Sequence, residues 1–452
     1  MEFMGSPIEK NLVKGNALLI RGPASLRLKS GRLDIVGAEI AFPQTIVIRR
    51  GKAVPMISME DSSIEVLVGE GGDLQEIHEN PFPEEWFKAI EEIISMPSDP
   101  FKVIIFGATD SGKTTLSTLF ANKAIKNGLK TAVVDGDLGQ SDIGPPTTLS
   151  MALLKRPIVD LFNAKPDKVI FIGAPSPSGR EEEVIKGLAL LQKEALRLGA
   201  QRIVVNTDGW MEGKGAEAYK LSLARRLEPD LVLFLKSEGL VSDLPQRLLE
   251  EGIKVRILDS PRGIVRRSRE VRRELRELGY RKELRDLVFR TIPLSWLKME
   301  DLILGRGLPI PQERLSELGK ELGRRILYGE EGDEGTLLVF EEENPPQKML
   351  EEFSERRGRK VFILQRGIEG GLLIALLGKD GEFKGLALID EIDYERRSMR
   401  LRARYTGPIG AIKIGSVKLD EKMNEVVHFD RCPLSPTCHS KVSQQGRGEA
   451  QP

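Results

Sequence analysis

The sequence contains few cysteines and no long apolar run, and each absence excludes a class of protein. Only Cys432 and Cys438 occur in 452 residues, so a disulfide framework is excluded and a reducing compartment is expected. No run of 18 apolar residues and no apolar signal core is present, so we expect a soluble, cytoplasmic protein with no membrane partner. The formal net charge is zero, so any surface that binds nucleic acid must be local.

The length and the pattern of apolar residues predict three domains and a tail. Short apolar runs separated by glycines in residues 1–97 predict a small N-terminal β domain, followed by a linker helix. Residues 98–290 alternate strands with helices, and residues 291–430 are again rich in strands. The polar residues 431–452 are predicted to be a disordered tail. The expected fold is therefore an α/β core with a parallel sheet, flanked by an N-terminal β domain and a C-terminal β-rich domain.

The central domain gives the clearest pattern of strands and helices. Its strands are predicted at 102–106, 131–135, 168–172, 202–206, 231–235 and 253–258. Its helices are predicted at 113–127, 181–198, 214–227 and 243–251. In the last domain, a helix over 311–327 is predicted to precede an acidic linker at 330–334.

A glycine-rich loop joins the first predicted strand of the central domain to the helix that follows it. It reads GATDSGKT from Gly107 to Thr114. Backbone N–H groups at the start of a helix favour phosphate oxygens, so a P-loop NTPase core that binds a nucleotide is predicted. Lys113 would reach the β- and γ-phosphates, and Thr114 would ligate Mg²⁺. The predicted nucleotide-binding residues are Gly107, Thr109, Asp110, Ser111, Gly112, Lys113, Thr114 and Thr115. The alternative is a glycine-rich turn that binds no nucleotide.

Two carboxylates, Asp135 and Asp137, end the next predicted strand. An aspartate at the end of a strand beside a phosphate loop commonly supports Mg²⁺. A phosphotransferase also needs a group that accepts the proton of the attacking hydroxyl. The two aspartates could divide these tasks, although a solvated turn would use the same residue types.

Residues 261–285 carry ten basic side chains and four glutamates, a local excess of six positive charges. On a helix, Arg269, Arg272, Arg273 and Arg276 would share one face. Such a face could hold a transferring phosphoryl group or follow a nucleic-acid backbone. The alternative is a solvated helix with internal salt bridges.

Taken together, these motifs resemble those of the polynucleotide 5′-hydroxyl kinase family. The resemblance rests on GATDSGKTT, VDGDLGQSDIGPPTTLSM, FIGAPSP and NTDGWMEGKG, which occur in the family's order within about 107–290. The family includes archaeal RNA kinases, the ribosomal-RNA-processing kinase and the kinase-like subunit of the eukaryotic mRNA 3′-end cleavage factor. Its members have flanking domains at both ends, which fits the three-domain prediction.

The resemblance implies a role for each matching residue. Lys113 would be catalytic, Asp137 would be the general base, and Asp135 would support the metal together with Thr114. Gln140, Thr207 and Trp210 would contact the substrate, with the indole stacked on its terminal base. The basic segment would be a lid, whose arginines Arg267, Arg272 and Arg276 match the family's pattern.

The resemblance therefore implies an ATP- and Mg²⁺-dependent kinase that phosphorylates the 5′-hydroxyl of RNA, with single-stranded DNA as a second substrate class. Proteins of RNA processing are the expected partners. Two alternatives stay open. Some members bind ATP as non-catalytic scaffolds of an RNA-processing complex, and the same core also occurs in small-molecule kinases and nucleotide-driven switches.

Overall fold

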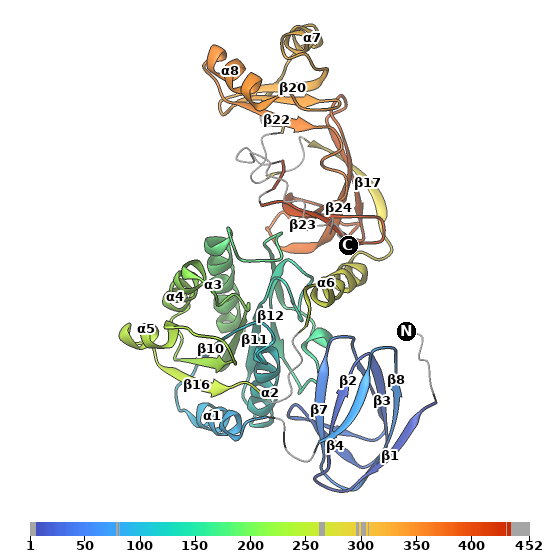
Figure 1. Cartoon of the computed structure of the whole chain (residues 1–452), viewed down its shortest axis with the longest axis vertical. Coiled ribbons are helices and arrows are strands. Elements are labelled where there is room, and N and C mark those ends of the chain that lie inside the picture. Colours follow the sequence, from blue (N-terminus) through green and yellow to red (C-terminus); the bar gives the residue numbers. More distant parts are fainter. Residues whose placement is uncertain are drawn as a thin grey trace, which may run out of the picture. The chain divides into compact units, whose positions relative to one another are not determined.

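The computed structural model describes residues 6–77, 80, 82–261, 267–294, 298–299, 304–305, 307–430 and 432–434. The chain divides into two compact units, Met1–Arg276 and Glu277–Pro452 (Figure 1). The predicted boundary at residue 290 falls inside the second unit. Among the helices of the described residues, none combines the length and the apolar character needed to cross a bilayer.

Nine short strands at the start of the first unit form two antiparallel sheets. The four-stranded sheet has the order β1-β8-β3-β6, with β1 at Ile8–Leu12, β3 at Ala24–Ser30, β6 at Gln44–Ile48 and β8 at Ser62–Val68. The five-stranded sheet has the order β5-β4-β7-β2-β9, with β2 at Ala17–Arg21, β4 at Arg32–Ile35, β5 at Ala38–Ala41, β7 at Ala53–Ser58 and β9 at Asp73–Ile77. Alternate residues of β8, such as Ile64 and Val66, are buried, as expected of strands with one face in a core.

The centre of the first unit is a seven-stranded sheet with the order β13-β12-β11-β14-β10-β15-β16. Its strands are β10 (Phe101–Gly107), β11 (Thr131–Gly136), β12 (Thr148–Leu154), β13 (Lys168–Phe171), β14 (Arg202–Thr207), β15 (Leu231–Lys236) and β16 (Val255–Asp259). The five strands from β11 to β16 in this order are parallel, whereas β12 and β13 are antiparallel to their neighbours. The predicted parallel sheet is confirmed for these five strands, whereas β12 and β13 make the whole sheet a mixed one. The prediction lacked β12, because a short apolar run without helical or alternating period does not identify a strand.

Helices cover both faces of this sheet. They are α1 (Glu84–Ser95), α2 (Lys113–Lys126), α3 (Glu181–Arg197), α4 (Lys214–Leu227) and α5 (Leu244–Glu250), with a short 3₁₀ helix, η1, at Leu161–Asn163. Helix α6 (Arg269–Glu283) follows β16 in the chain and spans the boundary between the two units. Helices α3 and α4 lie side by side and share one apolar core with the sheet (Figure 1). On the opposite face, α1 and α2 belong to a core that also contains the residues of the N-terminal sheets. The first β region and the central sheet are therefore packed through one continuous core.

The second unit contains two further sheets. One has the order β17-β25-β24-β23-β26-β18, with β27 paired to β26, and the other has the order β19-β20-β21-β22. Their strands are β17 (Val288–Pro293), β18 (Lys298–Met299), β19 (Leu308–Pro309), β20 (Ile326–Gly332), β21 (Gly335–Phe340), β22 (Val361–Gln365), β23 (Leu372–Leu377), β24 (Phe383–Asp393), β25 (Ser398–Ala403), β26 (Ala411–Leu419) and β27 (Glu425–His428). Helices α7 (Gln312–Glu321) and α8 (Gln347–Arg357) pack on the smaller sheet.

Three expectations for this unit need correction. The predicted helix 311–327 ends at Glu321, and the predicted acidic linker lies in β20 and its hairpin with β21. Glu330 is buried there because its carboxylate accepts the backbone N–H groups of Gly305 and Gly307 and the hydroxyl of Tyr328. Near the chain end, Cys432 and Leu434 are buried in the apolar core, so packing extends beyond residue 430. Residues 435–452 of the predicted tail lie outside the described residues.

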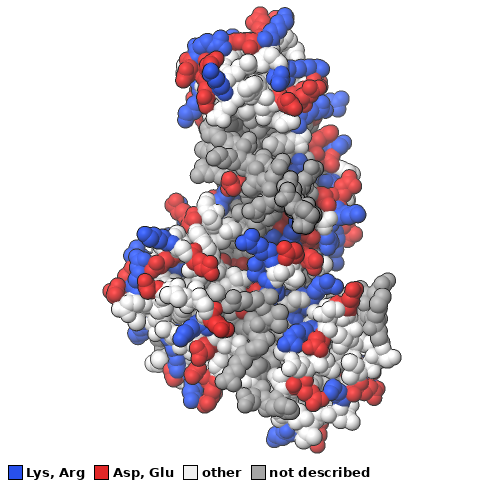
Figure 2. All heavy atoms as spheres, in the orientation of Figure 1, with Lys and Arg blue, Asp and Glu red and all other residues white. Residues whose placement is uncertain are grey.

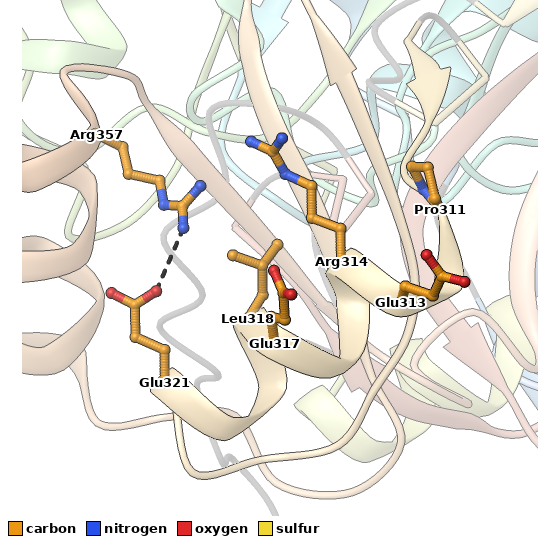
Figure 3. A pocket seen from close by; sticks show the side chains of 7 residues that line it. All are labelled: Pro311, Glu313, Arg314, Glu317, Leu318, Glu321 and Arg357. Atoms are coloured by element: carbon orange, nitrogen blue, oxygen red, sulfur yellow. Dashed lines mark hydrogen bonds and ion pairs between the residues drawn. The ribbon is translucent and has the colours of Figure 1, made fainter.

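A cavity of about 410 Å³ lies in the second unit, at α7 and α8. It is lined by Pro311, Glu313, Arg314, Glu317, Leu318, Glu321 and Arg357 (Figure 3). The guanidinium of Arg357 points toward the carboxylate of Glu321 and lies 3.3 Å from it. None of these seven residues belongs to the predicted catalytic site.

Candidate active site

The phosphate loop connects β10 to α2 in the geometry that the sequence predicts. Gly112 precedes the helix with φ +98°, a left-handed conformation that favours glycine. Lys113 is the first helical residue, and its ammonium donates hydrogen bonds to the carbonyl oxygens of Gly107 at 3.0 Å and Ala108 at 2.8 Å. Burial lowers the pKa of Lys113 to about 8. The lysine is thus held on the loop, where its charge is only partly compensated.

Asp110, in the middle of the loop, is bound to the predicted lid. It adopts a left-handed φ of +60°, which aspartate tolerates better than most residues. Its Oδ1 accepts a hydrogen bond from Nε of Arg267 at 2.6 Å, and its Oδ2 accepts the backbone N–H of Arg267 at 2.9 Å. The guanidinium of Arg272 lies 3.5 Å from the same carboxylate. Asp110 therefore pairs with Arg267 and Arg272, two of the arginines that are predicted to bind phosphate.

Asp135 is fully buried at the end of β11, and hydrogen bonds converge on its carboxylate. Its Oδ2 accepts the backbone N–H groups of Asp142 at 2.7 Å and Ile143 at 3.2 Å. Its Oδ1 accepts the side-chain amide of Asn206 at 3.1 Å. Burial, together with the negative charges of Asp142 and Asp137, raises the pKa of Asp135 to about 7. A cation placed here would favour the ionised form.

The surroundings of Asp135 fit a magnesium ion. The side-chain amide of Asn206, on the neighbouring strand β14, also lies 3.4 Å from the hydroxyl of Thr114. The amide oxygen of Asn206 is buried and has no hydrogen-bond partner among the described residues. Oxygen donors of this kind suit Mg²⁺, which commonly uses one or two protein oxygens together with phosphate and water. Within the described ranges, no three His, Cys, Asp or Glu side chains form a metal-binding cluster.

Asp137 lies two residues beyond Asp135, where the strand has turned into a loop. Its Oδ1 accepts the backbone N–H groups of Gly139 at 3.1 Å and Gln140 at 3.0 Å, while Oδ2 accepts no hydrogen bond from the described residues. Burial raises the pKa of Asp137, and the positive charge of Lys113 opposes that shift. The carboxylate thus has one anchored oxygen and one available oxygen beside the phosphate loop.

Gln140 connects this loop to the lid. Its amide nitrogen donates to the carbonyl of Arg272 at 3.1 Å, and its amide oxygen accepts from the guanidinium of Arg267 at 3.2 Å. Arg267 precedes α6, whereas Arg272 and Arg276 lie on it. The predicted lid arginines Arg267 and Arg272 are therefore brought to the phosphate loop. The basic residues Arg262 and Arg266 lie outside the described residues.

The segment from Thr207 to Trp210 follows β14 and packs directly on the phosphate loop. A Cβ on Gly209 would lie 2.4 Å from the hydroxyl oxygen of Thr109 and 2.6 Å from its backbone, so only glycine fits this approach. The hydroxyl of Thr207 is buried and donates to the carbonyl of Ile105 at 2.7 Å, which ties β14 to β10. Trp210 is partly exposed and stacks on Tyr219, with ring centroids 5.8 Å apart.

Asp208 organises this segment through a buried network that the sequence did not single out. Its carboxylate accepts the backbone N–H of Trp210 at 3.0 Å and the hydroxyl of Tyr219 at 3.0 Å. It also forms an ion pair of 2.9 Å with Lys220, which is fully buried on α4. Burial lowers the pKa of Lys220, and the Asp208 charge opposes that shift. A lysine on the apolar face of a helix is the one signal in the sequence that pointed to such a partner.

Comparison with known proteins identifies the family. The family described as "mRNA cleavage and polyadenylation factor CLP1 P-loop" matches residues 107–283, the region of the site. A polyribonucleotide 5′-hydroxyl-kinase of Thermococcus kodakarensis is 30% identical over 264 residues, which are 58% of this chain and 74% of that protein. The chain belongs to the Clp1/polyribonucleotide 5′-hydroxyl-kinase family.

Further members of the Clp1/polyribonucleotide 5′-hydroxyl-kinase family match most of the chain. The polyribonucleotide 5′-hydroxyl-kinase of Methanocaldococcus jannaschii is 27% identical over 359 residues, or 77% of this chain and 95% of that protein. The structure titled "Structure of wild-type Clp1p-Pcf11p (454 -563) complex" has a TM-score of 0.63 at 14% identity and covers 91% of this chain and 98% of its own. This likeness shows that the flanking β regions belong to the family fold along with the P-loop core.

Proposed function

We propose that this chain is an ATP-dependent polyribonucleotide 5′-hydroxyl kinase, which moves the γ-phosphoryl group of ATP to the 5′-hydroxyl of an RNA end. Archaeal relatives that carry this name align over most of the chain. Asp137 supports the proposal most directly, because its available oxygen lies beside the phosphate loop within reach of the Lys113 charge.

The phosphate loop would bind the triphosphate through its backbone N–H groups. Lys113 would exchange the carbonyls of Gly107 and Ala108 for phosphate oxygens, which are stronger acceptors because they are charged. Thr114 and Asp135 would hold Mg²⁺, with Asn206 beside both. The bound ion would neutralise charge on the β- and γ-phosphates.

Asp137 would act as the general base. In the transfer step, the 5′-oxygen forms a bond to the γ-phosphorus while the bond from that phosphorus to the β–γ bridging oxygen breaks, which releases ADP. The hydroxyl proton passes to Oδ2 of Asp137, while Oδ1 stays fixed by the N–H groups of Gly139 and Gln140. The raised pKa of Asp137 suits a proton acceptor better than that of an ordinary aspartate.

The lid arginines would stabilise the negative charge that spreads over the transferring group. Arg267 and Arg272 are already close to the phosphate loop through Asp110 and Gln140. Arg276 lies one turn further along α6 and would extend the same basic face. Binding of the γ-phosphate would draw these guanidinium groups away from Asp110.

The RNA end would be held mainly by stacking and local charge. Trp210, partly exposed beside the phosphate loop, would stack on the terminal base, and Gln140 would help to orient the end. On the face drawn in Figure 2, lysine and arginine side chains alternate with aspartate and glutamate, in keeping with the zero net charge. A protein partner from RNA processing stays a prediction of the family resemblance.

A transfer assay with γ-labelled ATP and Mg²⁺ tests this proposal. The acceptors are a single-stranded 5′-hydroxyl RNA, the matching DNA and a free nucleoside, with Asp137→Asn assayed in parallel. We expect labelled RNA, and a loss of rate of about 10²–10⁴-fold in the variant at unchanged ATP affinity.

The other outcomes identify the alternatives. Label on the nucleoside alone would indicate a small-molecule kinase. Tight ATP binding without transfer to any acceptor would indicate a non-catalytic scaffold. Full activity of Asp137→Asn would remove Asp137 from the role of base and leave the kinase proposal intact.

A further inference from the structure

Asp142 is a buried carboxylate that joins the N-terminal β region to the predicted magnesium site. Its side chain is 7% exposed. Its Oδ1 accepts a hydrogen bond from the guanidinium of Arg49 at 2.8 Å, and its Oδ2 accepts one from the ammonium of Lys52 at 2.8 Å. Both cations lie in the turn between β6 and β7, about 90 residues earlier in the chain. Both oxygens of Asp142 are thus held by the first β region.

Arg49 is itself firmly placed. Its Nε and Nη2 donate to the two carboxylate oxygens of Asp160, each at 2.9 Å, in a bidentate pair. The guanidinium also lies 3.9 Å from the ring centroid of Phe162. Two aspartates and an aromatic ring thus fix the guanidinium of Arg49, so Arg49 holds the side chain of Asp142 in a defined position.

The backbone of the same turn binds Asp135. The N–H groups of Asp142 and Ile143 donate to Oδ2 of Asp135 at 2.7 and 3.2 Å, and the hydroxyl of Ser141 lies 3.4 Å from that oxygen. Any shift of residues 141–143 would therefore move the carboxylate that accepts the side-chain amide of Asn206, which in turn lies next to the hydroxyl of Thr114. The side chain of Asp142 sets the place of its own N–H group.

Charge explains why the two cations are needed. Asp142 brings a negative charge next to Asp135, and that charge alone would repel the Asp135 carboxylate. Arg49 and Lys52 compensate the added charge from the side of the β region. Without them, the turn that supplies the N–H groups to Asp135 would be electrostatically unfavourable.

We infer that Arg49, Lys52 and Asp142 are positioning residues for phosphoryl transfer, which hold the 141–143 turn so that its N–H groups fix Asp135 at the magnesium site. The inference rests on the proposed function only for the identity of the reaction. The N-terminal β region thereby contributes to the geometry of metal binding, although neither cation contacts the ion.

The test measures how strongly Mg²⁺ tightens ATP binding, with no RNA present. The dissociation constant of ATP is determined by calorimetry in EDTA and in saturating Mg²⁺, for the whole chain and for Lys52→Met, Lys52→Arg and Asp142→Asn. We expect the ratio of the two constants to fall about tenfold in Lys52→Met and in Asp142→Asn, as is usual for residues that orient a metal ligand. Affinity in EDTA should stay unchanged, and Lys52→Arg, which keeps the charge, should retain most of the ratio.

The matched control is Lys126→Met. Lys126 forms a 2.7 Å ion pair with Glu39 and so also links α2 to the N-terminal sheets, but it does not contact Asp135. In the double variant Lys52→Met/Asp142→Asn, the ratio should fall no further than in Asp142→Asn alone, because Lys52 acts through Asp142.

The inference would be overturned if Lys52→Met and Asp142→Asn lowered only the melting temperature and left the ratio of the two ATP dissociation constants unchanged. These ion pairs would then contribute to stability alone. If Asp142→Asn does not fold, Lys52→Met carries the test, since Arg49 still pairs with both aspartates. Because the measurement needs no acceptor, a failure of RNA phosphorylation would refute the proposed function without affecting this result.

Discussion

At the scale of single residues, Asp110 and Trp210 lie beside the places where the proposed reaction would put the phosphates and the acceptor, respectively. Asp110 draws Arg267 and Arg272 onto the phosphate loop, and Trp210 stacks on Tyr219 in the segment that packs on that loop.

Asp110→Asn should tighten ATP binding. The carboxylate repels the triphosphate and competes with it for Arg267, so its removal should favour binding by about 1 kcal/mol, or roughly fivefold. Equilibrium binding of ATP in Mg²⁺ measures the change, with Asp73→Asn at an exposed ion pair as control. Weaker binding would mean that Asp110 orients the lid for ATP instead of competing with it.

Trp210→Ala should weaken binding of the RNA end without changing the affinity for ATP. Stacking of a base on an aromatic ring contributes about 1–3 kcal/mol, so KM for RNA should rise roughly 5- to 150-fold at unchanged KM for ATP. Trp210→Phe keeps an aromatic ring on Tyr219, so its KM for RNA should lie between those of the parent chain and Trp210→Ala. An equal rise in both KM values would indicate that the indole only supports the loop.

At the scale of elements, the loop after β14 and the phosphate loop approach more closely than any side chain at residue 209 permits. Gly209→Ala would place a methyl group 2.4–2.6 Å from Thr109, so the two loops must separate. We expect a loss of about 1–3 kcal/mol of stability together with lower activity. Thermal unfolding and the transfer assay measure both.

Gly215→Ala is the matched control for that substitution. Gly215 lies in α4, where an added Cβ would meet only Trp210 at ordinary contact distance, 3.5 Å. Alanine also favours a helix over glycine by about 1 kcal/mol. The control should therefore be as stable as the parent chain or more stable. Equal loss in both variants would contradict the role given to Gly209.

At the scale of the whole molecule, Glu369 couples the stability of the second unit to pH. Its side chain is buried, and burial raises the pKa of this carboxyl above the usual value, so folding favours the protonated form. As pH rises from the pKa of the unfolded chain through the higher folded value, the parent chain loses stability. The Glu369→Gln side chain cannot ionise, so this variant should not lose stability as the pH rises through that range.

At neutral pH, Glu369→Gln should therefore melt at a higher temperature than the parent chain. Below about pH 4, near the ordinary glutamate pKa, the two melting temperatures should converge. Scans between pH 4 and pH 8 provide the comparison. A Glu369→Gln chain that is less stable at every pH would show that the ionised carboxylate, with the backbone N–H groups around it, is the favoured form.

Much of the fold could be predicted because its signals are local. The strand before Gly107, the helix from Lys113 and the acidic pair Asp135 and Asp137 follow from apolar periodicity and glycine placement, and the structure puts them where the sequence indicates. The predictions were wrong where a local signal was ambiguous. The acidic run around Glu330 reads as a linker, yet it belongs to β20 and its hairpin, because these residues pair with β19 and β21. Backbone N–H groups from residues 305 and 307 bind the buried Glu330 carboxylate there.

The sequence by itself determined the phosphate loop, the carboxylates beside it and the family, since these depend on residues close together in the chain. Only the tertiary structure decided that Arg267 binds Asp110, that Lys220 lies buried on Asp208, and that Lys52 reaches Asp142. Ion pairs depend on distance in space, and the partners in two of these three pairs are 90 residues or more apart in the chain. Backbone preference and apolar period carry no information over such separations.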